Sequence, residues 1–343
     1  MTRPPLPARR PASDAAPLAM TCGEPAGVGP ELARRAWETL GPSLPFLWIG
    51  DPRHLPRGTP TATIDHASEA RGACERGLPV LARRFPERAR PGEPSAANAQ
   101  GVVDAIALGV DLALAGAVSG LCTAPIHKAA LQEGCGFAFP GHTEFLAHLC
   151  GVERVAMMLA CDALRVVPAT IHIPLSEVPR ALTPEGLEAT LRLVHRALRD
   201  DFAIAHPRVA VAGLNPHAGE GGHIGREEVE WVAPLLDRLR GEGMALLGPL
   251  SADTLFHAEA RARYDCAVAM YHDQALIPIK TIDFAGGVNV TLGLPIARTS
   301  PDHGTALDIA GQGRADATST INALVLAEGL ARARARRAAM APT

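Results

Sequence analysis

Three histidines occupy the same kind of position in the sequence, and imidazole is a common metal ligand. His172, His217 and His272 each come after an apolar run that is typical of a buried strand, and each is followed by a turn. If those strands lie in one parallel sheet, their carboxyl ends line one edge and the three rings converge there. Three neutral imidazoles with an open fourth position make a catalytic site for zinc or a similar divalent metal. The wide spacing matches no short zinc motif, so three separate surface or capping histidines remain an alternative.

The stretch 271–316 holds many groups that bind metal, phosphate or carboxylate, and we place the active site there. Arg298 and Lys280 suit an anionic substrate, because arginine grips a phosphate or carboxylate with two parallel hydrogen bonds. His142 and Thr143, from an earlier turn, suit the same role. The alternative for Lys280 and for Arg298, each taken singly, is an ordinary surface residue that forms an ion pair.

The predicted metal site is compatible with two chemistries, hydrolysis by an activated water or oxidation of an alcohol with a hydride acceptor. Asp253 and Asp273 are candidates for orienting ligands or moving protons. The sequence contains no G-x-G-x-x-G after a strand, no P-loop and no G-x-S-x-G elbow. A Rossmann-type cofactor site, an NTPase and a serine acyl transferase therefore lack their motifs.

Strands and helices alternate along the chain, which predicts βαβ units and a largely parallel sheet. The segment 23–31 is a rigid, Gly- and Pro-rich turn that either binds an anion or only connects a strand to a helix. We expect helices at 31–40, 96–115, 184–200, 226–240 and 318–337. We expect strands at 17–21, 46–51, 117–123, 155–159, 164–171, 209–214 and 266–270.

Composition indicates an ordinary globular protein, with 47% apolar and 20% charged residues. The net charge of −3 gives no reason to expect nucleic acid or a membrane surface as a partner, and no run approaches the length of a membrane span. Seven cysteines without a C-x-x-C pair indicate reduced thiols and a cytoplasmic location. Residues 1–17 have the composition of a disordered extension. We interpret the basic clusters at 3–10 and 332–337 as frayed, solvated ends, with a phosphate-binding tail as the alternative.

Several long segments resemble the 4-hydroxythreonine-4-phosphate dehydrogenase family of pyridoxal 5′-phosphate biosynthesis. They are GEPAGVGPE, TAPIHK, PGHTEFLA, NPHAGEGGHIGREE, GPLSADTLF, YHDQALIPIKTIDF and GGVNVTLGLPIARTSPDHGTALDIAGQGRAD. The resemblance runs in order from about Leu18 to Leu330. The chain departs from the family in having Ala275, where Gly is frequent, and a longer N-terminus.

The resemblance implies an α/β fold like that of isocitrate and isopropylmalate dehydrogenases, with two α/β subdomains flanking a central cleft. We expect the first subdomain at 18–138 and 285–337 and the second at 139–284, with the latter carrying the metal ligands and the dimer contacts. That fold binds NAD without the Rossmann fingerprint. The segment 302–311 is similar to the cofactor loop of the wider superfamily, so the implied cofactor residues are Asp302, His303, Gly304 and Asp308.

By the same resemblance, His172, His217 and His272 are ligands of a divalent metal (Zn2+, or Mg2+ or Co2+) in a site shared across a homodimer. The implied substrate contacts are His142, Thr143, Lys280, Asn289 and Arg298. The implied reaction is oxidation of 4-phosphooxy-L-threonine by NAD+ or NADP+ to 2-amino-3-oxo-4-phosphooxybutanoate, which loses CO2 to give 3-amino-2-oxopropyl phosphate. Lys280 or Asp273 transfers the proton.

Other functions remain open on the motifs. Within the fold, a catabolic relative would oxidise 4-phospho-threonate, 4-phospho-erythronate or a cis-dihydrodiol carboxylate with the same metal and cofactor. A metal-dependent hydrolase would work without NAD(P)+, and a phosphate acyltransferase would need neither the histidines nor a metal. A noncatalytic binding module fits least well, since the ligand set is complete.

Overall fold

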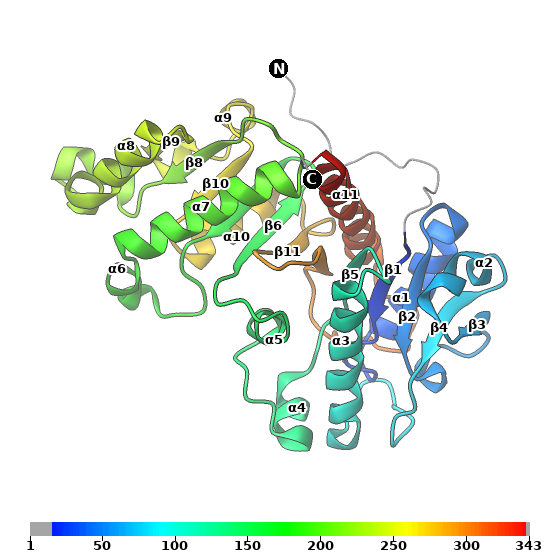
Figure 1. The fold of residues 1–343 in the computed structure, drawn as a ribbon. Helices are drawn as coiled ribbons and strands as arrows, with labels where there is room; N and C mark the ends of the chain where they lie inside the picture. Colours follow the sequence, from blue (N-terminus) through cyan, green and yellow to red (C-terminus); the bar gives the residue numbers. More distant parts are fainter. Residues whose placement is uncertain (1–15, 341–343) are drawn as a thin grey trace. The chain divides into compact units, whose positions relative to one another are not determined.

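The computed structural model describes residues 16–340, so nearly all of the predicted N-terminal extension lies outside the described residues. Within this range the chain divides into two compact units. Unit 1 comprises 155–293 and 333–340, and unit 2 comprises 16–154 and 294–332. Each unit has its own layer of strands covered by helices, as Figure 1 shows.

Unit 2 is built on six parallel strands in the order β3-β4-β2-β1-β5-β12. The central strands β1, β2 and β5 are buried at every residue, because helices cover both faces of such a sheet. The strands are β1 (Leu18–Thr21), β2 (Phe46–Gly50), β3 (Thr61–Ile64), β4 (Leu78–Ala82), β5 (Gly120–Thr123) and β12 (Arg298–Pro301). The helices are α1 (Gly29–Leu40), α2 (Ala70–Cys74), α3 (Ala99–Leu114), α4 (Lys128–Cys135) and α5 (His142–Leu149).

Unit 1 has a mixed sheet in the order β11-β6-β7-β10-β8-β9. The strands from β7 to β9 are parallel, whereas β6 pairs antiparallel with both β7 and β11. The strands are β6 (Ala156–Cys161), β7 (Leu164–Pro168), β8 (Arg208–Ala212), β9 (Ala245–Leu250), β10 (Cys266–Ala269) and β11 (Val288–Leu292). The helices are α6 (Val178–Ala181), α7 (Pro184–Asp200), α8 (Ala233–Gly241), α9 (Ala258–Arg261) and α10 (His272–Ile282).

Helix α7 forms where the sequence predicts it. The Thr183 hydroxyl oxygen accepts a hydrogen bond from the Gly186 N–H (3.1 Å), and Pro184 occupies the first helical position. Its buried residues recur every three or four positions, so one apolar stripe packs against β6, β8 and β11. The members of this stripe are Leu187, Leu191, Val194 and Leu198.

Other predicted elements differ from the structure in length or type. The helix expected at 226–240 is a π-helical turn, Glu228–Val232, followed by α8. The turn expected after His272 is instead the first turn of α10, which the sequence analysis missed because Pro278 interrupts the pattern. The units divide at 154/155, 293/294 and 332/333, whereas the sequence analysis placed the subdomain boundaries at 138/139 and 284/285 and kept 285–337 together. The physical reason is that α5 packs on α3 in unit 2, whereas β11 pairs with β6 in unit 1.

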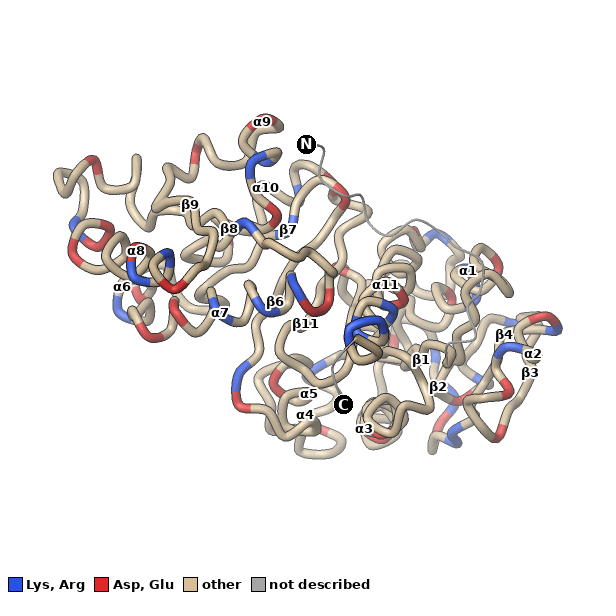
Figure 2. The backbone as a smooth tube through the Cα atoms, turned by 45° about the horizontal axis from the view of Figure 1, so that its top comes forward, with Lys and Arg blue, Asp and Glu red and all other residues tan. Residues whose placement is uncertain are grey.

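The basic cluster at 332–337 was wrongly interpreted as a frayed end, since it continues helix α11 (Thr318–Met340). Figure 2 shows its basic residues on the last turns of this helix. Arg334 donates to the Asp201 carboxylate at 2.8 and 3.0 Å, and Arg337 pairs with Asp200. The C-terminal part of α11 is therefore held by the acidic end of α7 within unit 1.

One helical stretch in the described residues, Ala96–Leu114, is long and apolar enough to cross a membrane by length and composition alone. Its α-helical part, α3, packs against β1, β2 and β5 of unit 2. Gly109 lies where a Cβ atom would come within 2.7 Å of the Leu121 side chain. This helix has the contacts of a core helix.

The seven cysteines are all free thiols. Five of them are buried, and burial raises the pKa of the Cys122 thiol to about 12. Only Cys135 and Cys150, both in unit 2, are partly exposed. None of the seven takes part in a disulfide.

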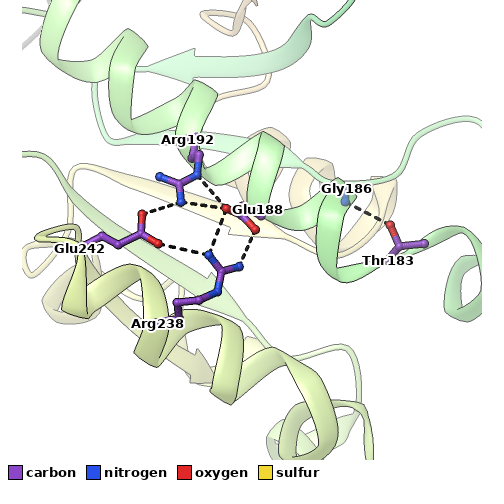
Figure 3. Close-up of polar contacts among 6 residues, drawn as sticks. All are labelled: Thr183, Gly186, Glu188, Arg192, Arg238 and Glu242. Carbon is purple, nitrogen blue, oxygen red and sulfur yellow. Dashed lines mark hydrogen bonds and ion pairs between the residues drawn. The ribbon is translucent and has the colours of Figure 1, made fainter.

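An ion-pair network joins α7 to α8 in unit 1 (Figure 3). The Glu188 carboxylate accepts hydrogen bonds from Arg238 (2.5 Å) and Arg192 (2.9 Å), and Glu242 accepts from both arginines as well. The hydrogen bonds from Arg238 and then from Arg192 lower the pKa of Glu188 to about 2. A carboxyl group whose pKa is lower in the folded state stabilises the fold above its unfolded pKa and loses that contribution as the pH falls.

We predict that Glu188→Gln destabilises the protein at pH 7 in low salt, and that the difference from the unchanged chain shrinks as the pH falls from about 4.5 towards 2. The measurement is denaturant unfolding across this pH range. High salt should reduce the difference, because the network is solvent-accessible. Glu133→Gln, an exposed acid for which the described residues provide no ion pair, is the control. A pH-independent difference would contradict the prediction.

Candidate functional site

The three histidines follow three neighbouring parallel strands of unit 1. β10 lies between β7 and β8, with Ala267 paired to Val166 on one side and Ala210 on the other. His172 comes after β7, His217 after β8 and His272 after β10, in each case at the carboxyl end of the strand. The parallel arrangement assumed from the sequence is thus present, and all three side chains start from the same edge.

His172 and His272 lie side by side. Their ring centroids are 5.6 Å apart, with the ring planes at 43°. The pairing of β7 with β10 continues beyond the strands, because Ala169 N–H donates to the Ala269 carbonyl (2.7 Å) and the Thr170 hydroxyl to the Met270 carbonyl (2.8 Å). These bonds keep the segments after β7 and β10 side by side, and both His172 and His272 line one cavity of about 240 Å³.

His217 begins a left-handed turn. Six consecutive residues from His217 to Gly222 have positive φ, a conformation that costs energy for residues other than glycine. The His217 Nδ1 lies 2.6 Å from the Glu220 carboxylate, and this hydrogen bond raises the pKa of the exposed imidazole. The negative charge of Asp253 acts in the same direction.

Glu228, which the sequence analysis did not single out, holds this turn in place. Its buried carboxylate accepts hydrogen bonds from the Asn215 N–H (2.8 Å) and side-chain amide (2.9 Å). A Cβ atom at Gly219 would come within 2.8 Å of the same carboxylate, so the turn packs directly on it. Glu228 is also the first residue of the π-helical turn, a feature that often accompanies functional sites. The acidic pair after a Gly-rich turn was the sequence signal for this role.

Within residues 16–340, no three His, Cys, Asp or Glu side chains are placed closely enough to hold a metal ion. The structure brings two of the predicted ligands together, and His217 lies apart from them in its own hydrogen bond with Glu220. The donor set itself fits a borderline divalent metal, since all three side chains are imidazoles on one sheet edge.

The remaining predicted residues of unit 1 lie on α10 and β11. Asp273 accepts a hydrogen bond from His272 Nδ1 at 2.7 Å, which orients that ring. Lys280 lies in the last turn of α10, with Nζ 5.5 Å from the centroid of the Phe284 ring. Asn289 on β11 has a buried side-chain oxygen that meets no donor among the described residues.

Arg298 and His142 are neighbouring residues of the predicted substrate site in unit 2. The buried Arg298 guanidinium donates to the Thr123 hydroxyl from Nη2 (2.6 Å) and Nε (3.2 Å), and burial lowers its pKa to about 10. The arginine therefore remains charged at neutral pH. Burial, and then the Arg298 charge, hold the pKa of His142 well below its usual range, so its ring is neutral. Thr143 follows in the first turn of α5.

The predicted cofactor loop of unit 2 is docked against the Gly-rich turn after β1. Val28 N–H donates to the Thr305 carbonyl (3.0 Å), and a Cβ atom at Gly27 would lie 2.7 Å from that oxygen. Glycine at this position permits the close approach. His303 Nδ1 contacts the Gly304 carbonyl at 2.9 Å, and the Asp302 N–H donates to the Ser319 hydroxyl at 2.9 Å.

The predicted site residues thus divide between the units. Unit 1 contains His172, His217, His272, Asp273, Lys280 and Asn289, and unit 2 contains His142, Thr143, Arg298, Asp302, His303, Gly304 and Asp308. Gly304 and Asp308 are both exposed on the loop.

Comparison with known proteins gives one consistent result. The family described as pyridoxal phosphate biosynthetic protein PdxA matches residues 45–327. The 4-hydroxythreonine-4-phosphate dehydrogenase of Paracoccus denitrificans is 60% identical over 323 residues, which cover 93% of this chain and 99% of the relative.

Solved structures agree with the sequence match. The 4-hydroxythreonine-4-phosphate dehydrogenase of Klebsiella pneumoniae has a TM-score of 0.85 and 38% identity, covering 93% of this chain and 99% of that one. A terephthalate 1,2-cis-dihydrodiol dehydrogenase of Burkholderia xenovorans has a TM-score of 0.63 and 29% identity, covering 92% and 98%. The predicted α/β fold is confirmed, and the chain belongs to the pyridoxal phosphate biosynthetic protein PdxA family.

Proposed function

We propose that this protein oxidises 4-phosphooxy-L-threonine with a nicotinamide cofactor in pyridoxal 5′-phosphate biosynthesis. The secondary alcohol loses a hydride to NAD+ or NADP+ and a proton to the protein, giving 2-amino-3-oxo-4-phosphooxybutanoate. This β-keto acid then releases CO2 to form 3-amino-2-oxopropyl phosphate. Membership of the PdxA family and the names of the relatives support the assignment.

The observation that carries the proposal is the presence of His172, His217 and His272 at the carboxyl ends of three adjacent parallel strands. These residues would hold a divalent metal, with Zn2+, Mg2+ and Co2+ as the candidates. When bound, such a metal supplies Lewis acidity, which makes a hydroxyl group easier to deprotonate. Asp273 keeps the His272 ring oriented through its bond to Nδ1.

The chain's other residues bind the substrate and move the proton. Arg298 carries a permanent charge that suits the substrate phosphate, and the neutral ring of His142 provides a hydrogen bond beside it. The side-chain oxygen of Asn289, which meets no donor in the part of the chain that the structure describes, is an acceptor for the substrate's hydroxyl or ammonium group. Thr143 and Lys280 complete the substrate contacts, and either Lys280 or Asp273 accepts the proton.

The nicotinamide cofactor is assigned to the loop that contains Asp302, His303, Gly304 and Asp308. Its docking against Gly27 and Val28 gives a rigid support for a ligand. We further propose a cytoplasmic homodimer that shares its active site between subunits and binds neither nucleic acid nor membrane.

Oxidation of a cis-dihydrodiol carboxylate is the second candidate, because one structural relative is named for that reaction. 4-Phospho-threonate and 4-phospho-erythronate belong to the same catabolic alternative. The higher identity to the Paracoccus relative, 60% against 29%, favours the biosynthetic substrate.

We predict that NADH forms from NAD+ and 4-phosphooxy-L-threonine, and that a chelator abolishes this turnover until a divalent metal is restored. The measurement is absorbance at the NADH band with each candidate substrate in turn. Turnover that survives complete metal removal would exclude the histidine site from the chemistry. Turnover only with 4-phospho-threonate would keep the mechanism and assign the protein to the catabolic alternative.

We predict that His217→Ala lowers kcat/KM by about 100-fold or more while the protein remains folded, because the metal loses a ligand. Turnover and metal affinity are measured together with circular dichroism. His206→Ala, an exposed histidine of the same unit, is the matched control and should behave like the unchanged chain. Equal activities of the two variants would remove His217 from the site.

We predict that Glu228→Gln weakens metal binding by about 10–100-fold and lowers the unfolding free energy by about 1–3 kcal/mol. The amide cannot accept from both Asn215 donors, so the left-handed turn loses its support. Metal titration and denaturant unfolding measure the two effects. Glu230→Gln, an exposed neighbour in the same turn, should leave metal affinity unchanged. If both variants bind metal alike, Glu228 has no positioning role.

A further inference from the structure

The Arg298 guanidinium has to be held in one orientation if it binds a substrate anion with two parallel hydrogen bonds. Bidentate binding depends on the plane of the guanidinium, and the arginine side chain rotates about several bonds. Arg298 is only 2% exposed, so water does not compensate for a misplaced charge. The substrate site therefore needs a residue that fixes this plane.

Thr123 makes two hydrogen bonds with the guanidinium. Its hydroxyl oxygen accepts from Nη2 at 2.6 Å and from Nε at 3.2 Å. These two nitrogens form one edge of the planar group, so two bonds to a single oxygen fix the rotation of the plane about the Cδ–Nε bond. Because a hydroxyl is uncharged, Thr123 orients the guanidinium without cancelling the positive charge that attracts an anion.

The pairing of β12 with β5 explains why Thr123 lies within reach. Arg298 is the first residue of β12 and is paired with Leu121 of β5. Thr123 lies two residues farther along β5, so its side chain points to the same face of the sheet as that of Leu121. Two residues of a strand span about 7 Å, a distance that an arginine side chain covers. The Thr123 hydroxyl therefore holds the guanidinium at the carboxyl end of β5.

The guanidinium held in this way lies close to His142, another predicted substrate residue of unit 2. Burial, and then the positive charge of Arg298, lower the pKa of the His142 ring. A rotation of the guanidinium would thus displace the charge relative to the ring beside it. Thr123 therefore influences how these two residues together present themselves to a substrate.

A second threonine provides a comparison within the same sheet. Thr21 of β1 is paired with Thr123, and both residues are fully buried. The Thr21 hydroxyl has no hydrogen-bond partner in the part of the chain that the structure describes. Burial in this row of the sheet does not by itself give a threonine hydroxyl a partner, so the bonds of Thr123 depend on Arg298.

We propose that Thr123 is a positioning residue of the substrate site, which holds the Arg298 guanidinium in the orientation that binds the anionic group of the substrate. This role rests on the proposed function, in which Arg298 binds the phosphate of 4-phosphooxy-L-threonine. Thr123 acts through Arg298 and does not itself contact the substrate. It therefore affects the affinity for the phosphate ester more than the rate of the chemical step.

The first test uses Thr123→Val, which keeps the shape of the side chain and removes the hydroxyl. In the metal-loaded full chain, the KM for 4-phosphooxy-L-threonine and its Kd by calorimetric titration should both rise about tenfold, while kcat changes less than about threefold. The KM for NAD+ should not change. A loss of folded protein alone would lower kcat and leave the KM as it is, so the KM distinguishes positioning from a structural role.

Two further variants serve as controls. Thr123→Ser keeps the hydroxyl and should have a KM within about twofold of the unchanged chain. Thr21→Val removes a buried hydroxyl without a partner from the paired position, and it should leave the KM and the Kd unchanged. If Thr123→Val does not fold, Thr123→Ala is compared with Thr123→Ser, since these two differ only in the hydroxyl. Equal KM values for that pair would contradict the proposal.

A double-variant cycle tests whether Thr123 acts through Arg298. Thr123→Val should lower kcat/KM in the unchanged chain but have no further effect in Arg298→Met, because the contact is already absent there. Additive effects would overturn the proposal, as would an unchanged KM in Thr123→Val. If the unchanged chain neither binds nor oxidises 4-phosphooxy-L-threonine, the proposed function fails and this role fails with it. Normal turnover with an ineffective Thr123→Val would refute the role of Thr123 alone.

Discussion

The hydrogen-bonded register of three parallel strands is the constraint on which the candidate site depends. β7, β10 and β8 run in the same direction, so their chains leave the sheet at one edge, and each carries a histidine within a few residues of that point. Backbone bonds beyond β7 and β10 keep two of these chains together, which explains why the His172 and His272 rings are neighbours. The pairing of the strands in the sheet therefore determines how close the histidines lie to one another.

His217, the third histidine, is positioned by a left-handed turn and not by strand pairing alone. His217 lies on a turn whose backbone conformation is unfavourable for most residues, and such a turn persists only when its surroundings determine it. Here the hydrogen bonds of Glu228 and the close contacts at Gly213 and Gly219 hold the turn in this conformation. The π-helical turn places Glu228 where its carboxylate reaches Asn215. The strained backbone of this turn costs conformational energy, and it fixes the position from which the exposed His217 side chain extends.

The sequence was sufficient for features that depend on local pattern. Apolar runs located the strands that precede the histidines, and Thr183 and Pro184 located the start of α7, because capping and periodicity act over a few residues. Features that depend on distant partners were missed or misplaced. Helix α10 contains a proline that obscures its pattern, and Glu228 supports a turn that precedes it in the chain through hydrogen bonds to Asn215. Helix α5 belongs to the unit of α3 because of packing that no local pattern encodes. The position of the His217 ring relative to the other two depends on side-chain geometry, which spacing alone does not contain.

The distribution of thiols has a practical consequence for studying this chain. Five cysteines are enclosed by the core, and the two that solvent reaches in part, Cys135 and Cys150, both belong to unit 2. A thiol-directed fluorophore or spin label would therefore attach to unit 2 and leave unit 1, with its three histidines, unmodified. The native sequence already provides site-selective attachment points, and spectroscopy of the histidine-bearing unit needs no prior removal of cysteines.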